Sequence, residues 1–209
     1  MRVVVLAATK GGVGKTTLAS ALAVRAAQES KRVALIDADP TASLERWWEL
    51  RGEPDNPRIL GVDCSAEALG LLISERWQWV FIDTPPALID EIAQAILVAD
   101  FVLIPTRASA IDVEAMDHVI ELCKERRKPF AFVLNAVQPT WKLTESAAAY
   151  LERDGKVLEP RICYRKAYIS AMTSGRSAPE VEKDGQAAKE IDALWASVKK
   201  FVVRSARAR

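Results

Sequence analysis

A glycine-rich segment near the start of the chain has the residue types and spacing needed to hold phosphate groups. Glycines let successive backbone N–H groups approach phosphate oxygens because they carry no Cβ atom. Lys15 has the length to reach the β- and γ-phosphates, the Thr16 hydroxyl suits Mg²⁺, and Thr17 can bond the α-phosphate. The nucleotide-binding residues that this segment predicts are Lys10, Gly11, Gly12, Val13, Gly14, Lys15, Thr16 and Thr17.

Two further segments place carboxylates after short apolar runs. Asp37 and Asp39 follow residues 33–36, and Asp83 follows residues 79–82. The carboxyl ends of strands face the ligand crevice in an open α/β sheet. There, one carboxylate can hold the water shell of Mg²⁺ while another orients an attacking water molecule. The predicted metal site therefore consists of Thr16, Asp37 and Asp83.

The elements that must position these residues are short apolar runs alternating with longer helical patterns. Nearly continuous apolar runs are typical of strands buried on both faces of a parallel sheet. The predicted strands span residues 3–7, 33–36, 79–82, 101–104 and 130–134, with weaker candidates at 58–62 and 156–163. The predicted helices span residues 16–30, 43–50, 65–76, 111–127 and 185–203. This alternation predicts one α/β domain over residues 1–209, with a doubly wound, mainly parallel sheet flanked by helices.

The glycine-rich segment follows a predicted strand and opens a predicted helix, which is the context of a P-loop. Its form KGGVGKT, with the additional Lys10, resembles the signature of the ParA/MinD family of deviant Walker A ATPases. Residues 37–40 are similar to the family's DxDP motif, and residues 80–86 to its Walker B segment. The resemblance covers essentially the whole chain, although its later parts are much less specific than the P-loop.

The resemblance implies a set of roles and partners. It implies an ATP-dependent homodimer in which Lys10 reaches the phosphates of the partner subunit. Catalysis would rest on Lys10, Lys15 and Asp39, with Asp39 activating the attacking water. Turnover would be slow alone, and a ParB-like protein or a cargo adaptor would stimulate it.

Asn135 bears on the choice between ATP and GTP. It ends the apolar run 130–134 and begins the sequence Asn-Ala-Val-Gln, whereas GTP-specific relatives carry NKxD at this point. The missing carboxylate disfavours guanine, so ATP is the expected nucleotide. By similarity to the family, Asn135 is predicted to contact adenine; a simple turn residue is an equally good interpretation.

The P-loop begins almost at the first residue, so we expect no helix-turn-helix extension before it. The chain therefore resembles the short plasmid-partition type of ParA and ParA-like proteins that act in conjugation or cargo positioning. The expected function is to partition or position DNA or a protein cargo. Two alternatives stay open: a membrane-associated, MinD-like regulator and a metabolic P-loop enzyme with a small-molecule acceptor. Lys10 argues against the second alternative.

Composition limits the environment and partners of the chain. The formal net charge of +1 gives no global field that favours nucleic acid or membrane, so binding must come from a local patch. The three cysteines form no CxxC pair, and no apolar stretch approaches the roughly 20 residues that span a bilayer. With no signal peptide evident, a cytoplasmic protein is expected. An amphipathic stripe over residues 191–202 is more typical of core packing than of membrane binding.

Basic residues crowd the C-terminal part of the chain. If a dimer gathers them on one face, they can contact DNA phosphates without reading sequence. We therefore predict that the ATP dimer binds nonspecific DNA and associates with the nucleoid, whereas the ADP monomer does not. Solubilising charge is an equally good explanation for each residue. The candidate DNA contacts are Arg161, Arg165, Lys166, Arg176, Lys199, Lys200 and Arg204.

Overall fold

A seven-stranded parallel sheet forms the centre of the protein. The structure, a computed structural model, describes residues 1–30, 32–61, 76–138 and 141–207. In this part of the chain the strands are β1 (Arg2–Leu6), β2 (Val33–Asp37), β3 (Arg58–Ile59), β4 (Trp79–Asp83), β5 (Phe101–Thr106), β6 (Phe130–Leu134) and β7 (Lys156–Val157). Their order is β3-β2-β4-β1-β5-β6-β7, and neighbouring strands are parallel. Strands are added on both sides of β1, which confirms the predicted doubly wound sheet.

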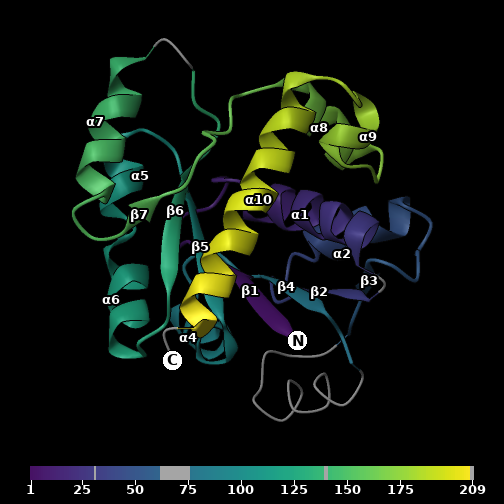
Figure 1. The fold of residues 1–209 in the computed structure, drawn as a ribbon, viewed down its shortest axis with the longest axis horizontal. Helices are drawn as coiled ribbons and strands as arrows, with labels where there is room; N and C mark the ends of the chain where they lie inside the picture. Colours follow the sequence, from purple (N-terminus) through teal and green to yellow (C-terminus); the bar gives the residue numbers. More distant parts are fainter. Residues whose placement is uncertain (31, 62–75, 139–140, 208–209) are drawn as a thin grey trace.

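Helices cover both faces of the sheet, as Figure 1 shows. The first face carries α1 (Lys15–Glu29), α2 (Ser43–Leu50), α8 (Lys166–Thr173), α9 (Ala178–Val181) and α10 (Gln186–Arg207). The second face carries α4 (Ile89–Val98), α5 (Ala110–Glu114), α6 (Asp117–Glu125) and α7 (Lys142–Leu151). The nucleotide segment lies between β1 and α1, where the chain passes from the sheet to the first face.

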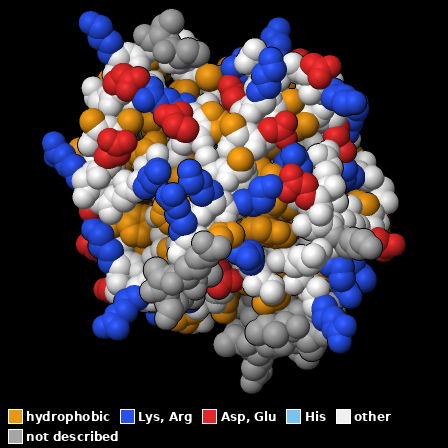
Figure 2. All heavy atoms as spheres, in the orientation of Figure 1, with side chains coloured by type: hydrophobic (Ala, Val, Ile, Leu, Met, Phe, Trp, Pro, Cys, Tyr) orange, Lys and Arg blue, Asp and Glu red, His pale blue; other side chains and the backbone are white. Residues whose placement is uncertain are grey.

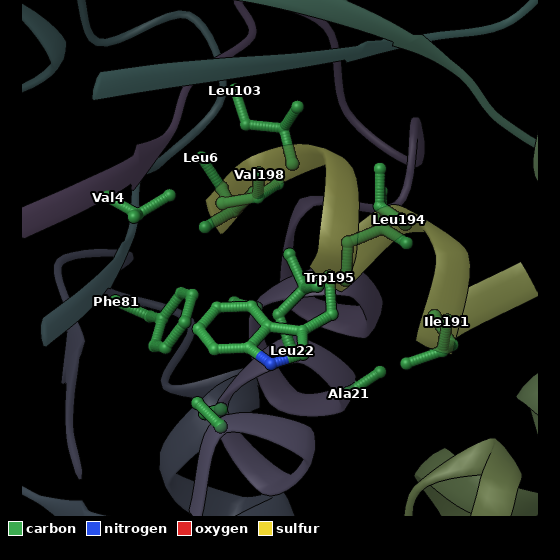
Figure 3. Close-up of a cluster of buried hydrophobic side chains, with 14 of the residues drawn as sticks. Val4, Leu6, Ala21, Leu22, Phe81, Leu103, Ile191, Leu194, Trp195 and Val198 are labelled. Carbon is green, nitrogen blue, oxygen red and sulfur yellow. The ribbon is translucent and has the colours of Figure 1, made fainter. Parts of the chain in front are cut away.

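Two apolar cores follow from the alternation of side chains along each strand. In β1, Val4 belongs to the core under α1 and α10, whereas Val5 belongs to the core under the other helices. Trp195 of α10 fills the first core, with its ring close to Phe81 (Figure 3). It is 1% exposed and meets Trp79 edge-on at 4.7 Å between ring centroids. This packing fixes α10 against the sheet.

The structure confirms most predicted elements, divides one predicted helix and shortens one predicted strand. The helix predicted over residues 111–127 is two helices, α5 and α6, separated by Ala115 and Met116. The Ala115 carbonyl accepts the Thr9 hydroxyl at 2.6 Å, so it does not continue the helical ladder, and the Met116 side chain is fully buried. The predicted strand 156–163 shortens to β7, because Pro160 has no N–H for a ladder bond. The predicted helix 65–76 lies almost wholly outside the described residues.

The amphipathic stripe of α10 lies in the core. Its apolar members are between 0% and 2% exposed: Ile191, Leu194, Trp195, Val198 and Val202. This confirms the interpretation of the α10 stripe as a packing surface. In the described residues, no helix has the length and apolar character to cross a bilayer.

Candidate functional site

The glycine-rich loop is held from outside by hydrogen bonds to its carbonyl groups. Ala87 donates its amide to the Thr9 carbonyl at 2.8 Å, and the Asn135 amide donates to the Val13 carbonyl at 2.7 Å. Arg107 donates to the Gly12 carbonyl. Because a trans peptide points its N–H opposite to its carbonyl, these bonds turn the corresponding N–H groups toward the other side of the loop. The result is a row of backbone donors suited to phosphate oxygens.

These donors border a hollow of about 280 Å³ at the carboxyl ends of the strands. Most of the predicted phosphate-binding residues line it, together with Asp39 of the predicted catalytic set. Ser43 and Pro86 complete the lining. The full set is Gly11, Gly12, Gly14, Lys15, Thr16, Thr17, Asp39, Ser43 and Pro86. The geometry therefore brings together the P-loop and Asp39, as the sequence predicts.

Lys15 provides a buried ammonium group at this hollow. Its side chain donates to the carbonyls of Ala8 and Lys10 at 3.1 and 3.2 Å, and the residue is 6% exposed. Burial lowers the pKa of Lys15, and the negative charges of Asp83 and Asp39 oppose that shift. An ammonium held in this way gains strongly from a phosphate oxygen, because the anion compensates its lost hydration.

Asp83 and Thr16 form the centre of the predicted metal site. The Thr16 hydroxyl donates to Asp83 Oδ2 at 2.6 Å, whereas the buried Asp83 Oδ1 has no hydrogen-bond partner among the described residues. Burial raises the pKa of Asp83 to about 7, and the nearby charge of Asp37 acts in the same direction. An unpartnered buried carboxylate oxygen beside a hydroxyl is a hard-oxygen donor set that fits Mg²⁺.

Mg²⁺ fits this site without a complete cage of protein ligands. No group of three or more His, Cys, Asp or Glu side chains that could hold a metal occurs within the described ranges. Mg²⁺ commonly binds one or two protein oxygens and takes its other ligands from phosphates and water. Thr16 and Asp83 supply such a partial set next to the phosphate hollow.

Asp37 has a structural contact in addition to its predicted metal role. It ends β2 directly beside Asp83 of β4. Its Oδ2 accepts the amides of Leu44 and Glu45, in the first turn of α2, at 2.9 and 3.0 Å. Burial raises the pKa of Asp37 against the effect of these bonds. Asp37 therefore joins the metal site to α2, whereas Asp39 lies in the following loop and faces the hollow.

Lys10 is engaged inside its own subunit. Its ammonium lies 2.9 Å from Asp112 Oδ1, a carboxylate in α5 whose side chain is 7% exposed. Burial tends to raise the pKa of Asp112, but hydrogen bonds from Ser109 and Lys10 lower it overall. The predicted role of Lys10 in the partner subunit stays a prediction, and it would require Lys10 to leave Asp112.

Asn135 lies against the back of the P-loop. It is 9% exposed, and a Cβ atom added to Gly14 would lie 2.0 Å from its Nδ2. One N–H of its Nδ2 bonds the Val13 carbonyl, and the predicted contact with the adenine amino group, a donor, would use the acceptor Oδ1. Asn135 thus has a positioning role that the motif did not predict.

The structure divides the predicted DNA-contact residues into two groups. Four of them already bond acceptors in the protein: Arg161 with Glu145, Arg165 with Glu190, Lys199 with Glu29, and Arg176 with the Glu180 carbonyl. The other three, Lys166, Lys200 and Arg204, are exposed and have no ion pair with any described residue.

Two of the unpaired cations lie at one hollow on the first face. Lys200, Arg204 and Lys156 line a hollow of about 160 Å³ between β7 and α10. Figure 2 shows lysine and arginine side chains gathered on the face that α10 crosses. Lys166 begins α8, near the start of α10, where Arg165 bonds Glu190. Lys200 lies about 15 Å further along α10 at the helical rise, so the basic residues extend along the helix instead of forming one spot.

Three residues at the site were not assigned a role from the sequence. Arg107 and Asp112 follow β5, whose end meets the same crevice as β1 and β4, and Ser43 begins α2. Position after a central strand was the available indication for the first two. Ser43 could not be found in this way, because only the folded path of the loop after β2 brings it to the phosphate hollow.

Comparisons with known proteins agree with this geometry. Residues 4–178 match the model of the CobQ/CobB/MinD/ParA nucleotide binding domain. The maintenance of carboxysome distribution protein A of Halothiobacillus neapolitanus is 31% identical over 88% of this chain and 90% of its own length. Protein ParA of Rhizobium radiobacter is 29% identical over 92% of each chain.

Solved structures share the fold. An ATP complex of a Cyanothece McdA variant superposes with a TM-score of 0.74 and 21% identity, over 97% of this chain and 96% of that one. The family match extends from β1 into α9 and includes the P-loop, both acidic strand ends and Asn135. On this match and the geometry of its phosphate hollow, the chain belongs to the CobQ/CobB/MinD/ParA family of nucleotide-binding domains.

Proposed function

We propose that this chain is an ATP-hydrolysing, Mg²⁺-dependent positioning ATPase that forms a homodimer with ATP and distributes DNA or a protein cargo. The observation that carries the proposal is the additional Lys10 in a P-loop whose donors face a hollow shared with Asp39. Similarity over nearly the whole chain to a carboxysome-distribution protein and to a ParA protein supports this class of function.

In this proposal the backbone donors and Lys15 hold the triphosphate, and Thr17 bonds the α-phosphate. Thr16 and Asp83 hold Mg²⁺, with Asp37 contacting its water shell. When bound, Mg²⁺ would neutralise charge on the phosphate oxygens. Asn135 accepts the adenine amino group through Oδ1. The phosphate-binding roles use residues that line the hollow, the metal roles use the Thr16–Asp83 pair and its neighbour Asp37, and Asn135 lies behind the P-loop at Val13.

Dimerisation depends on Lys10, and hydrolysis depends on Asp39. Lys10 leaves Asp112 and reaches the γ-phosphate bound to the partner subunit, so that one nucleotide joins two copies. Asp39, half-buried at the rim of the hollow, orients the attacking water. A cargo adaptor or ParB-like protein speeds this step, after which the ADP-bound copies separate.

The proposed binding surface for the ATP-bound dimer is DNA of any sequence. The three cations without ion partners in the described chain, Lys166, Lys200 and Arg204, are the leading contacts, because no ion pair has to break before they reach a phosphate. Arg161, Arg165, Arg176 and Lys199 would first exchange a protein partner. Contact through phosphates alone predicts that binding weakens steeply with salt.

The proposal is tested with Asp39→Ala, which is expected to bind ATP and stall before hydrolysis. Light scattering on a sizing column should give a dimer with Mg²⁺–ATP and a monomer with Mg²⁺–ADP, and Lys10→Ala should stay monomeric in both. A gel shift with random-sequence duplex should show retention only under dimer conditions. A monomer with every nucleotide, or equal retention with ATP and ADP, would contradict the proposal.

A further inference from the structure

Helix α2 contacts the metal site through its first turn and, further along, the segment 175–180 that carries Arg176. At its start, Asp37 accepts the amides of Leu44 and Glu45. In its second turn, the buried Trp47 donates its indole N–H to the Arg176 carbonyl at 2.9 Å. The helix has eight residues and is therefore about 12 Å long.

Arg51, directly after α2, makes the strongest contact with this loop. Its guanidinium donates two hydrogen bonds to the Glu180 carboxylate, at 2.6 and 2.7 Å, and a third to the Gly175 carbonyl at 3.2 Å. Glu180 in turn accepts the amide of Ser177 at 2.7 Å. Paired bonds of this kind fix orientation as well as distance. Arg51 therefore holds both ends of the segment 175–180.

The two backbones also meet directly. Gly175 has a φ of +64°, and a Cβ atom placed there would lie 2.3 Å from the Arg51 nitrogen and 2.4 Å from the Leu50 carbonyl carbon. No side chain can be accommodated at this contact unless one backbone moves. A displacement at the end of α2 is thus passed to Gly175 without slack.

We infer that Trp47 and Arg51 are positioning residues that couple the nucleotide state at Asp37 to the placement of segment 175–180, which carries Arg176. This rests on the proposed function, in which Mg²⁺–nucleotide binds beside Asp37 and Arg176 faces DNA. Cation binding beside Asp37 redistributes the bonds of its carboxylate and so moves the first turn of α2. Trp47 and Arg51 transfer that movement to the carbonyls of Arg176 and Gly175.

The coupling is tested by hydrogen exchange of the full-length chain, free and with Mg²⁺ and a non-hydrolysable ATP analogue. In the wild type, peptides covering residues 41–51 and 174–182 should both change exchange rate on nucleotide binding. In Arg51→Met and Trp47→Phe, the 41–51 response should persist, whereas the 174–182 response should fall at least about fivefold, the lower range of measured couplings. Arg51→Lys, which keeps the charge but loses the bidentate geometry, should give an intermediate response.

Arg25→Met is the matched control. Arg25 also forms ion pairs, with Glu29 in its own helix and with Asp192 of α10, and its loss changes the net charge equally. It should leave both exchange responses at wild-type size. Duplex binding with the analogue should be weakened about fivefold by Arg51→Met relative to this control. If Arg51→Met unfolds below the assay temperature, the responses of Trp47→Phe and Arg51→Lys are compared with that of Arg25→Met instead.

Two results would overturn the inference. One is a wild-type 174–182 segment that does not respond to nucleotide; the other is an undiminished response in Trp47→Phe and the Arg51 variants. The exchange measurement needs only nucleotide binding. Suppose that the wild-type protein binds nucleotide and shows the exchange response at 174–182 but does not retain DNA. This result would contradict the DNA part of the proposed function and would leave the coupling intact.

Discussion

The phosphate hollow and the basic face of α10 both attract anions, but they are built differently. In the hollow, the donors are backbone N–H groups whose carbonyls are held by Asn135, Arg107 and Ala87. On the basic face, the donors are flexible side chains, and their availability depends on nearby carboxylates such as Glu29. A local motif is enough to specify the first, whereas the second depends on which acidic residues the fold brings alongside.

The comparison also explains why the two regions should differ in the strength of their attraction to anions. Lys15 is buried, so a phosphate that it meets interacts in a poorly hydrated environment and the attraction is strong. Lys200 and Arg204 are exposed, so their attraction to DNA is screened by salt and must be summed over many contacts. The burial of Lys15 therefore favours tight binding of one ligand in the hollow, whereas contact of the face with DNA, as proposed, would be weak and sensitive to salt.

The largest expected effect is at the buried cation. Lys15→Ala should weaken ATP binding about 100-fold, because it removes a desolvated charge that bonds the phosphates. Titration of a fluorescent ATP analogue measures the change. Lys10→Ala is the control: Lys10 lies on Asp112, so monomer affinity should change less than threefold while dimerisation is lost. Equal losses in both variants would break the distinction between the two lysines.

A smaller effect, about 10-fold, is expected from pH at the metal site. With its pKa raised to about 7, Asp83 holds a proton at pH 6 that Mg²⁺ must displace, and it is ionised at pH 8. Apparent Mg²⁺ affinity with bound nucleotide should therefore rise about 10-fold from pH 6 to 8. Asp83→Asn gives the baseline from the nucleotide's own phosphates. A wild-type profile equal to that baseline would contradict the role of Asp83.

The same shift has a consequence for folding of the nucleotide-free chain. The pKa of Asp83 is higher in the folded chain than its ordinary value of 3.8. This group therefore contributes most to the free energy of unfolding below pH 3.8. Its contribution then declines as the pH rises to about 7. The Asp83→Asn variant should lose this part of the pH dependence in thermal unfolding.

A more moderate effect on phosphate affinity is expected from Asn135, which supports the P-loop from behind. Asn135→Ala leaves the Val13 carbonyl without its donor and frees the Val13–Gly14 peptide to rotate. Affinity for inorganic triphosphate should fall about fivefold, the cost of one unsatisfied buried acceptor. Triphosphate has no base, so this measurement separates support of the loop from any adenine contact. Unchanged triphosphate affinity with weakened ATP affinity would assign Asn135 to the base alone.

The smallest effects are expected on the basic face. Lys200→Ala with Arg204→Ala should weaken duplex binding a few-fold and reduce the slope of log affinity against log salt by about 2. Arg161→Ala is the matched comparison, because Arg161 is held by Glu145 and should change the slope by less than about half as much as the pair. Filter binding at several salt concentrations resolves the two. If Arg161→Ala reduced the slope by about 1, half the change in the double variant, ion pairing in the protein would not rank these contacts.

The sequence predicts the hollow well because its determinants are local. The glycines, Lys15 and Thr16 lie in one loop, and continuous apolar runs identify the central strands. Contacts between distant segments could not be predicted. The Thr9 hydroxyl ends α5 at Ala115, Lys10 meets Asp112, and Glu145 occupies Arg161. In each pair, the two residues are distant in the sequence, and only the completed fold brings them into contact.

The burial of Trp195 affects how a force applied to α10 is transferred to the central sheet. Its indole lies against Trp79 and Phe81 of the central sheet, while Lys199 and Lys200 project from the next turn of the same helix. A force on the α10 backbone at these residues therefore acts directly on the sheet through Trp195. If the proposed DNA contact forms, tension along the DNA would be passed to the central strands through this buried ring.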